Sequence, residues 1–324
     1  MKLLFRALLL TWLATWGPLA QAQIEIRFGH VGEPGSLYDI AAQEYAKRIN
    51  TKLAGKVKVT LYGSSQLGGD KEMMQKMKLG TLEMSLPSSV MSSEADVFGL
   101  FEMPYLVKDR KHLGKIEKEI VLPKMYPAAQ AKGLKIIAMW ENGYRHITNN
   151  KRPIKVPADL QGIKLRVPEG KWRVKMFQAY GANPSPMKFS ELFTALSTGV
   201  MDGQENPLPQ IFSAKLYEAQ KHLSLSGHVY APAFLAVGAK KWAVLPADVR
   251  QVLEDTAKDV QQFCYDTADR LEQEWLDKMK AAGIQVTEVD KDAFIKASAP
   301  IYEEFSKEVL GAREMIERAI ALGK

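Results

Sequence analysis

The sequence predicts an α/β fold divided into two units, and two observations support this prediction. Short apolar strands alternate with amphipathic helices from residue 24 to about residue 198, a pattern typical of parallel strands with right-handed crossovers. A single helical pattern then runs from Pro246 to Gly283 with no internal glycine or proline. At about 1.5 Å per residue this helix exceeds the size of one small domain, so we expect it to pack along both units.

The first 22 residues have the three parts of a secretory signal. Lys2 and Arg6 form a basic region, residues 7–16 are almost wholly apolar, and residues 20–22 (AQA) have the small-x-small pattern of a cleavage site. The apolar run is too short to span a bilayer. We therefore predict a signal peptide over residues 1–22 that is cleaved after Ala22, and a mature protein in the periplasm.

Composition excludes several classes of protein. The chain has 324 residues, of which 46% are hydrophobic, as in ordinary globular proteins rather than collagen-like, disordered or multi-spanning membrane chains. The net charge is +7, and the predicted cleavage removes two basic residues (7 − 2 = 5). Basic and aromatic residues do not interleave in one cluster, so we expect no nucleic-acid partner. Cys264 is the only cysteine, at an apolar helical position, and we expect a packed thiol.

The first unit follows directly after the predicted signal. Alternating apolar residues predict strands at 24–28, 57–62 and 81–86. Three- and four-residue spacing predicts a helix at 36–52 and a second helix that carries Met73, Met74 and Met77. Asp70 precedes these methionines and can cap the second helix.

The second unit repeats the alternation. We predict strands at 134–139 and 164–167, a helix at 170–180 and a further helical segment from 191 to 198. The long helix after Pro246 has an apolar stripe at three- and four-residue intervals. The stripe consists of Val249, Leu253, Val260, Phe263, Cys264, Leu271, Trp275 and Met279.

Signatures of catalysis are missing from the sequence. The five histidines are scattered without zinc-site spacing, and no phosphate-binding loop or nucleophile elbow occurs. We therefore predict that the protein is not an enzyme and has no metal site and no cofactor. A hydrolase would need a nucleophile–base pair or a metal cluster that the sequence does not show.

Three segments carry a resemblance to a known family. They are residues 140–148 (WENGYRHIT), 157–168 (PADLQGIKLRVP) and 199–207 (GVMDGQENP). Together with 64–68 (SSQLG), 181–184 (GANP) and 186–192 (PMKFSEL), they resemble the TRAP transporter solute-binding proteins, the DctP-type periplasmic receptors. The resemblance covers most of the mature chain in order and at similar spacing.

The resemblance implies a two-lobe periplasmic-binding-protein-like fold with a ligand cleft between the lobes and a long helix packing along both. Lobe I would comprise residues 24–142 and about 232–271, and lobe II residues 143–231 and about 272–324. Such a protein closes around a small organic acid and delivers it to a sodium-coupled TRAP permease in the membrane. We expect a monomer.

Arg166 is the first candidate for contact with the acid. An arginine between Leu165 and Val167 is costly to bury unless it is paired, and its fork matches a carboxylate. An internal salt bridge is the alternative, but the resemblance implies that Arg166 clamps the ligand carboxylate. It also implies that Arg145 makes a second contact and that Asn206 orients the carboxylate, although Asn206 also suits a turn before a proline.

The remaining candidates concern the rest of the ligand. The resemblance implies that Phe189 lines the pocket, with core packing as the alternative. Loops of the N-terminal half are expected to set specificity at the ligand-facing end of the parallel strands. Their polar candidates are His30, Glu33, Gln66, Asp70 and Ser88. Asp70 has a plain capping role as its alternative, and Glu33 plain solvation.

The expected ligand is a hexuronate or a related sugar acid. Relatives that bind sialic acid have polar side chains where this chain has Val31, Gly69 and Ser88, which argues against sialic acid. Other hydroxy or keto monocarboxylates, including aromatic ones, come next. A C4-dicarboxylate would need a further cation, for which His30 is the obvious candidate. A sensory module with the same pocket is the alternative to a transport receptor.

Overall fold

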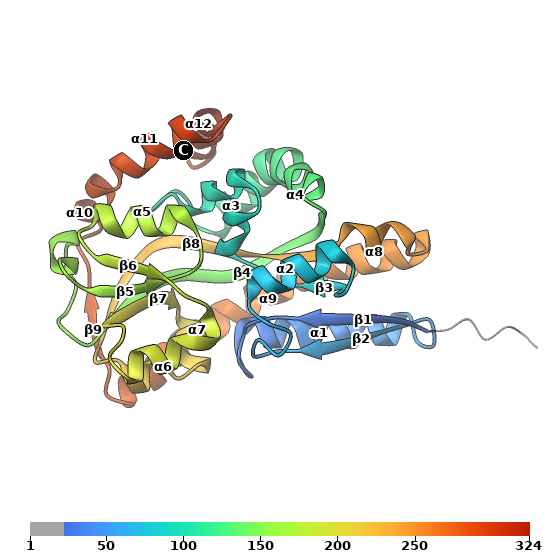
Figure 1. Ribbon diagram of the computed structural model, residues 1–324, viewed down its shortest axis with the longest axis horizontal. Helices are drawn as coiled ribbons and strands as arrows, with labels where there is room; N and C mark the ends of the chain where they lie inside the picture. The colour runs from blue at the N-terminus through green and yellow to red at the C-terminus, as the bar shows by residue number, and fades with distance from the viewer. Residues whose placement is uncertain (1–22) are drawn as a thin grey trace, which may run out of the picture.

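The computed structural model describes residues 23–324, so the predicted signal peptide at 1–22 lies outside the described residues. One mixed sheet of nine strands organises the molecule (Figure 1). Eight strands follow the order β2-β1-β3-β8-β4-β7-β5-β6, and β9 pairs with β8. Their bounds are β1 Ile24–Gly29, β2 Val57–Tyr62, β3 Met84–Ser85, β4 Leu134–Asn149, β5 Lys164–Val167, β6 Asn183–Pro186, β7 Gly203–Pro207, β8 His222–Gly238 and β9 Gln285–Glu288.

The two outer parts of the sheet are parallel, as predicted. β1 pairs in parallel with β2 and β3 in one lobe, and β5 pairs in parallel with β6 and β7 in the other. Crossover helices α1 (Leu37–Lys52) and α2 (Asp70–Leu79) serve the first lobe. Helices α5 (Lys171–Ala179) and α6 (Leu192–Ser197) serve the second lobe. The sequence predictions for β1, β2, β5 and the four helices are confirmed within a few residues, β3 has only two residues, and β6 and β7 were not predicted.

The centre of the sheet differs from the prediction. The sequence predicted a strand that ends at residue 139, but β4 continues to Asn149. Strand β8 was not predicted. Both strands are long and antiparallel to each other. Polar residues of β4 such as Glu141, Arg145 and His146 are buried, so the apolar alternation on which the prediction relied is absent there. Strand β8 contains glycine and proline, which local propensity places in turns.

The β4–β8 ladder passes from one lobe into the other (Figure 1). The predicted lobe boundaries at 142/143 and 231/232 face each other in this ladder, since Gly143 pairs with Ala231. A register shift lies between Glu141 and Gly143, and Gly143 has φ +117°, which favours glycine. This bulged segment is where the connection can bend.

Helix α9 (Ala247–Ala281) is a single helix of 35 residues, as the sequence predicted. It contacts α1 in the first lobe, β4 in the centre and α7 (Leu208–Ser213) in the second lobe, so its predicted packing along both lobes is confirmed. Trp140 Nε1 donates to the Ala257 carbonyl at 2.8 Å and ties β4 to the helix. Cys264 is buried in the core, as expected of a packed thiol.

Shorter helices complete the two lobes. Their bounds are α3 Arg110–Ile116, α4 Tyr126–Ala131, α8 Ala239–Val244, α10 Lys291–Ala297, α11 Ala299–Glu308 and α12 Ala312–Leu322, with a π-helical segment at Glu117–Met125. A second apolar cluster forms around α6, α7 and the end of α9, separate from the main core. Within residues 23–324 no helix is long and apolar enough to cross a membrane.

The predicted capping role of Asp70 is wrong. The N-cap of α2 is Gly69, and Asp70 is the first residue of the helix. Glu72 reaches back to accept a hydrogen bond from the Gly69 backbone N–H at 2.9 Å, so the cap is made without Asp70. The Asp70 carboxyl is left available for another role.

The close approach of β7 to β4 yields a stability prediction. A Cβ added to Gly203 would lie 2.3 Å from the Thr148 carbonyl oxygen, so Gly203→Ala must push the two strands apart. We expect it to lower the free energy of unfolding by about 2 kcal/mol or more in urea titrations. Gly114→Ala in α3 is the control, because a Cβ there meets nothing within 4 Å. It should be neutral or stabilising by up to about 1 kcal/mol. Equal effects of the two variants would contradict the prediction.

Candidate ligand-binding site

A cavity of about 500 Å³, including its opening to solvent, lies between the lobes. Its volume is that of a small-molecule site. The first lobe contributes the β1–α1 loop, the start of α2 and the segment around Ser88, and the second lobe contributes the ends of β5 and β7 with α7. The lining residues are Val31, Tyr38, Asp70, Ser88, Ser89, Val90, Asn142, Arg145, Arg166, Pro168, Glu169, Met187, Lys188, Phe189, Asn206 and Gln210.

Arg166 enters the cavity from β5 without a carboxylate partner. Its side chain is buried, and its Nε and Nη2 donate to the Met187 carbonyl at 2.9 and 2.6 Å. Its Cζ lies 6.0 Å from the centre of the Phe189 ring. Within residues 23–324, no Asp or Glu oxygen lies within 4.0 Å of its nitrogens. Burial, together with the charge of Arg145, lowers the pKa of Arg166 to about 10.

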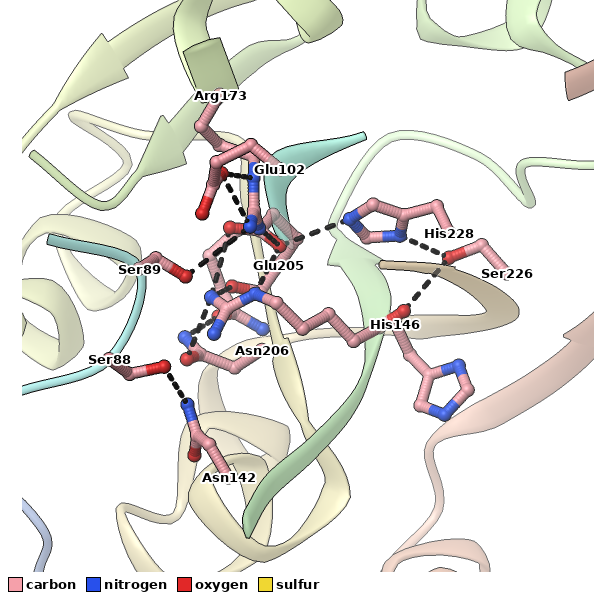
Figure 2. A network of polar contacts seen from close by, with 12 residues as sticks. Ser88, Ser89, Glu102, Asn142, His146, Arg173, Glu205, Asn206, Ser226 and His228 are labelled. Carbon is pink, nitrogen blue, oxygen red and sulfur yellow. Dashed lines mark hydrogen bonds and ion pairs between the residues drawn. The ribbon is translucent and has the colours of Figure 1, made fainter. Parts of the chain in front are cut away.

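Arg145 lies close by on β4 and is held by Glu205 of β7. Its Nε donates to Glu205 Oε2 at 2.6 Å and its Nη2 to Oε1 at 2.9 Å, a bidentate pair in which both residues are buried. Arg173 of α5 donates to the same Glu205 carboxylate at 2.5 Å and to Glu102 at 2.8 Å. Figure 2 shows Glu205 at the centre of this network. Glu205 therefore orients two arginines at once.

The titration behaviour of Glu205 follows from these contacts. Burial would raise its pKa, but Arg145 and Arg173 more than offset this effect and hold the pKa of the carboxyl well below its usual range. His228 Nε2 lies 3.1 Å from Glu205 Oε2. Burial lowers the pKa of His228 to about 4, so the imidazole is neutral at pH 7 and can donate through Nε2.

The buried arginines are not all paired with a carboxylate. Three buried arginines, namely Arg145, Arg166 and Arg173, face two buried glutamates that pair with them, Glu102 and Glu205. A buried positive charge without a partner is costly in a low-dielectric interior. A bound anion at Arg166 would remove this cost.

The orientation of the Asn206 amide is set at both ends. Arg145 can only donate, so the oxygen bonded to its Nη2 at 3.0 Å is Asn206 Oδ1. Asn206 Nδ2 donates to Gln204 Oε1. The other end of the same amide, Gln204 Nε2, donates to Thr148 Oγ1 at 2.9 Å. Thr148 in turn donates to Gln220 Oε1 at 2.9 Å. One N–H of Asn206 is left over by this chain, which suits a donor to a carboxylate.

Asp70 brings a carboxyl group into the cavity from α2. Its Oδ1 is buried and has no hydrogen-bond partner. Burial raises its pKa to about 7; the charge of Arg166 opposes this rise and that of Glu169 adds to it. The carboxyl thus titrates near neutral pH while it faces the site.

Two ion pairs join the start of α2 to the other lobe beside the cavity. Lys71 Nζ lies 3.7 Å from Glu169 Oε1, and Lys188 Nζ donates to Glu72 Oε1 at 2.6 Å. These side chains are partly or largely exposed, so each pair adds little to stability. They are weak contacts between the two lobes.

The structure brings together six of the nine site residues that the sequence suggested. Arg166, Arg145, Asn206, Phe189, Asp70 and Ser88 all line the cavity. The other three, His30, Glu33 and Gln66, do not line it. His30 is fully buried without a partner for either ring nitrogen, Glu33 accepts from Ser64 Oγ at 2.6 Å, and Gln66 is exposed.

Ten lining residues were not among the predicted site residues, and four of them show why they were missed. Asn142 stands inside a stretch that carried the family resemblance, and Glu169 directly follows the one that ends at Pro168, so both positions were within reach of the sequence. Tyr38 and Gln210 sit on helices without any distinguishing pattern. Only the tertiary structure places these two at the cavity.

A two-lobed fold with a buried, unpaired arginine in a cavity between the lobes has the features expected of a receptor for a small anionic solute. Residues 28–308 match the family described as bacterial extracellular solute-binding protein, family 7. The chain belongs to this family, whose members bind solutes and are not enzymes, and the resemblance predicted from the sequence is confirmed.

Named relatives show the range of ligands in this family. The chain is 32% identical to the 2,3-diketo-L-gulonate-binding periplasmic protein YiaO of Escherichia coli over 96% of each chain. It is 34% identical, with a TM-score of 0.88, to a TRAP periplasmic solute-binding protein of Polaromonas bound to D-erythronate, covering 92% of this chain and 99% of that one. A TRAP periplasmic solute-binding protein of Sulfurospirillum deleyianum with bound succinate is 30% identical, with a TM-score of 0.88, covering 93% and 100%.

The Glu205 network yields a prediction for stability and pH. Glu205→Gln leaves two buried arginines short of a counter-charge, so we expect a loss of about 3 kcal/mol in the free energy of unfolding at pH 7. Because the folded-state pKa of Glu205 is depressed, its contribution is present above about pH 4.5 and fades as the pH falls below that value. The difference between wild type and variant should shrink in urea titrations below this pH.

Glu72→Gln is the control for this comparison, because its ion pair with Lys188 is largely exposed. It should have little effect on the free energy of unfolding, because the glutamine oxygen can still accept from the Gly69 N–H. A loss for Glu205→Gln as small as that for Glu72→Gln would contradict the assignment of Glu205 as the residue that holds Arg145 and Arg173.

Proposed function

We propose that this protein is the periplasmic receptor of a TRAP transport system and binds a small organic acid through an arginine–carboxylate clamp. The observation that carries the proposal is the buried Arg166 guanidinium, which lines the cavity and pairs with no carboxylate in the described chain. Arginine suits this role because its planar fork matches both oxygens of a carboxylate.

In this mechanism the ligand carboxylate supplies the missing counter-charge. Arg166 binds it directly, Arg145 adds a second positive charge from its place against Glu205, and the remaining N–H of Asn206 donates to it. Phe189 covers the guanidinium of Arg166. Closure about the bulged β4–β8 segment excludes water and strengthens these contacts. No covalent bond is made or broken.

A sugar acid is the ligand class that we favour, with hydroxy and keto monocarboxylates next. The relatives that carry diketogulonate and erythronate in their names support this choice. A C4-dicarboxylate is the alternative, supported by the relative with succinate. Its second carboxylate would lie in the same cavity as Asp70 and Glu169, and His30 lies off the cavity with a pKa lowered by burial to about 4.

The destination of the ligand is also part of the proposal. We infer that the protein is exported by the predicted cleavable signal, acts as a monomer in the periplasm and hands its ligand to a sodium-coupled TRAP permease. A sensory receptor would use the same pocket. Uptake of labelled ligand by vesicles that contain the permease distinguishes the two. Uptake depends on this protein if it is a transport receptor, and does not depend on it if it is a sensory receptor.

A thermal-shift screen of organic acids followed by calorimetry tests the binding site. A true ligand at 100 times its dissociation constant should stabilise the folded protein by about 2.7 kcal/mol. Arg166→Ala should abolish this shift, and Arg166→Lys should weaken binding by roughly 100-fold or more, because lysine cannot form the bidentate contact. Arg318→Ala, at an exposed ion pair on α12, is the control and should bind as wild type. Unchanged binding by Arg166→Ala would refute the clamp.

A further inference from the structure

A directed chain of hydrogen bonds ends at the cavity in Gln210 of α7. The Pro232 carbonyl can only accept, and Ser88 Oγ donates to it at 2.6 Å. Ser88 Oγ then accepts from Asn142 Nδ2 at 3.4 Å, as Figure 2 shows, and Asn142 Oδ1 accepts from Gln210 Nε2 at 3.3 Å. The backbone carbonyl at one end therefore sets the orientation of every amide along the chain.

The consequence is that Gln210 keeps its oxygen for the cavity. Its Nε2 is used by Asn142, and its Oε1 is buried without any hydrogen-bond partner. The side chain is 3% exposed and lines the cavity. A buried acceptor without a donor is unfavourable, so a ligand that brings a donor to this oxygen gains affinity.

Asp70 is a second acceptor of the same kind. Its Oδ1 is also buried without a partner, and it reaches the cavity from the opposite lobe. Glu169 adds another carboxylate to the lining. The cavity thus has donors in Arg166, Arg145 and Asn206, a cation in Lys188 that is paired with Glu72, and unsatisfied acceptors in Asp70 and Gln210.

We propose that Gln210 is a specificity-determining residue which, together with Asp70, accepts hydrogen bonds from hydroxyl groups of the bound acid. The site then takes a polyhydroxy monocarboxylate and rejects a dicarboxylate. The oxygens of a second carboxylate would face the acceptor oxygens of Asp70 and Gln210, and no hydrogen bond could form between them. This inference rests on the proposed function, in which Arg166 holds the carboxylate. Ser88 and Asn142 are positioning residues, since they act through the orientation of Gln210.

Matched pairs of acids test the selectivity of the wild-type protein by calorimetry at pH 8, where Asp70 is largely ionised. Erythronate is compared with meso-tartrate and galactonate with galactarate, since each pair differs only in a terminal CH₂OH or carboxylate. We expect at least one aldonate to bind roughly 100-fold or more tightly than its dicarboxylate partner, because polar groups left unpaired in a buried site discriminate strongly.

Three variants test the role of Gln210. Gln210→Leu removes the acceptor and should weaken aldonate binding roughly tenfold or more. Gln210→Lys keeps a donor for Asn142 but presents a cation to the cavity, so it should shift the preference toward the dicarboxylate by at least roughly tenfold. Gln178→Leu, at an exposed site on α5, is the matched control and should bind as wild type. Thermal midpoints without ligand establish that each variant folds.

The outcomes separate the inference from the proposed function. Aldonate affinity within twofold of wild type in Gln210→Leu, or tighter binding of the dicarboxylates by the wild-type protein, would overturn the role of Gln210 and leave the arginine clamp standing. Failure of the clamp itself would show as unchanged binding of all acids in Arg166→Ala, or as no binding of any carboxylate by the wild-type protein.

Discussion

The structure depends on one electrostatic constraint, which is the burial of Arg166 between the lobes without a paired carboxylate. Arg145 and Arg173 share Glu205, and Arg173 also pairs with Glu102, but Arg166 is left with the Met187 carbonyl alone. Burying an unpaired guanidinium is unfavourable, and a bound carboxylate relieves that cost. The unpaired guanidinium lowers the stability of the ligand-free protein, but it is already in position to bind an anion, as expected of a preorganised site.

Neighbouring strands hold the polar groups around this charge in fixed orientations. Glu205 holds Arg145 bidentately, and the Asn206 amide is oriented by Arg145 on one side and by Gln204 on the other. Each of these residues lies on β4 or β7, so the donor side of the cavity is built on paired strands rather than on loops. In the proposed mechanism this rigid donor side holds the carboxylate end of the ligand, and groups from α2 and α7 contact the remainder.

The proposed closure would bend the same central strands. β4 carries Arg145 into the site and also contains the bulge between Glu141 and Gly143, where the ladder crosses between lobes. Helix α9 spans both lobes and stays packed on β4. The cavity is therefore assembled from groups on both sides of the bend, and the exposed ion pairs of α2 with Glu169 and Lys188 bias closure only weakly.

The sequence alone determined the elements that have a clear hydrophobic period and the residues that lie within recognisable motifs. Strands β1, β2 and β5, helices α1 and α9, and the positions of Arg166, Arg145, Asn206 and Phe189 follow from it. It could not predict β8 or the second half of β4, because their buried polar residues remove the alternation that marks a strand. Nor could it reveal the unpaired oxygens of Asp70 and Gln210 or the absence of His30 from the cavity. Those depend on which side chains from distant segments meet, and only the tertiary structure decided that.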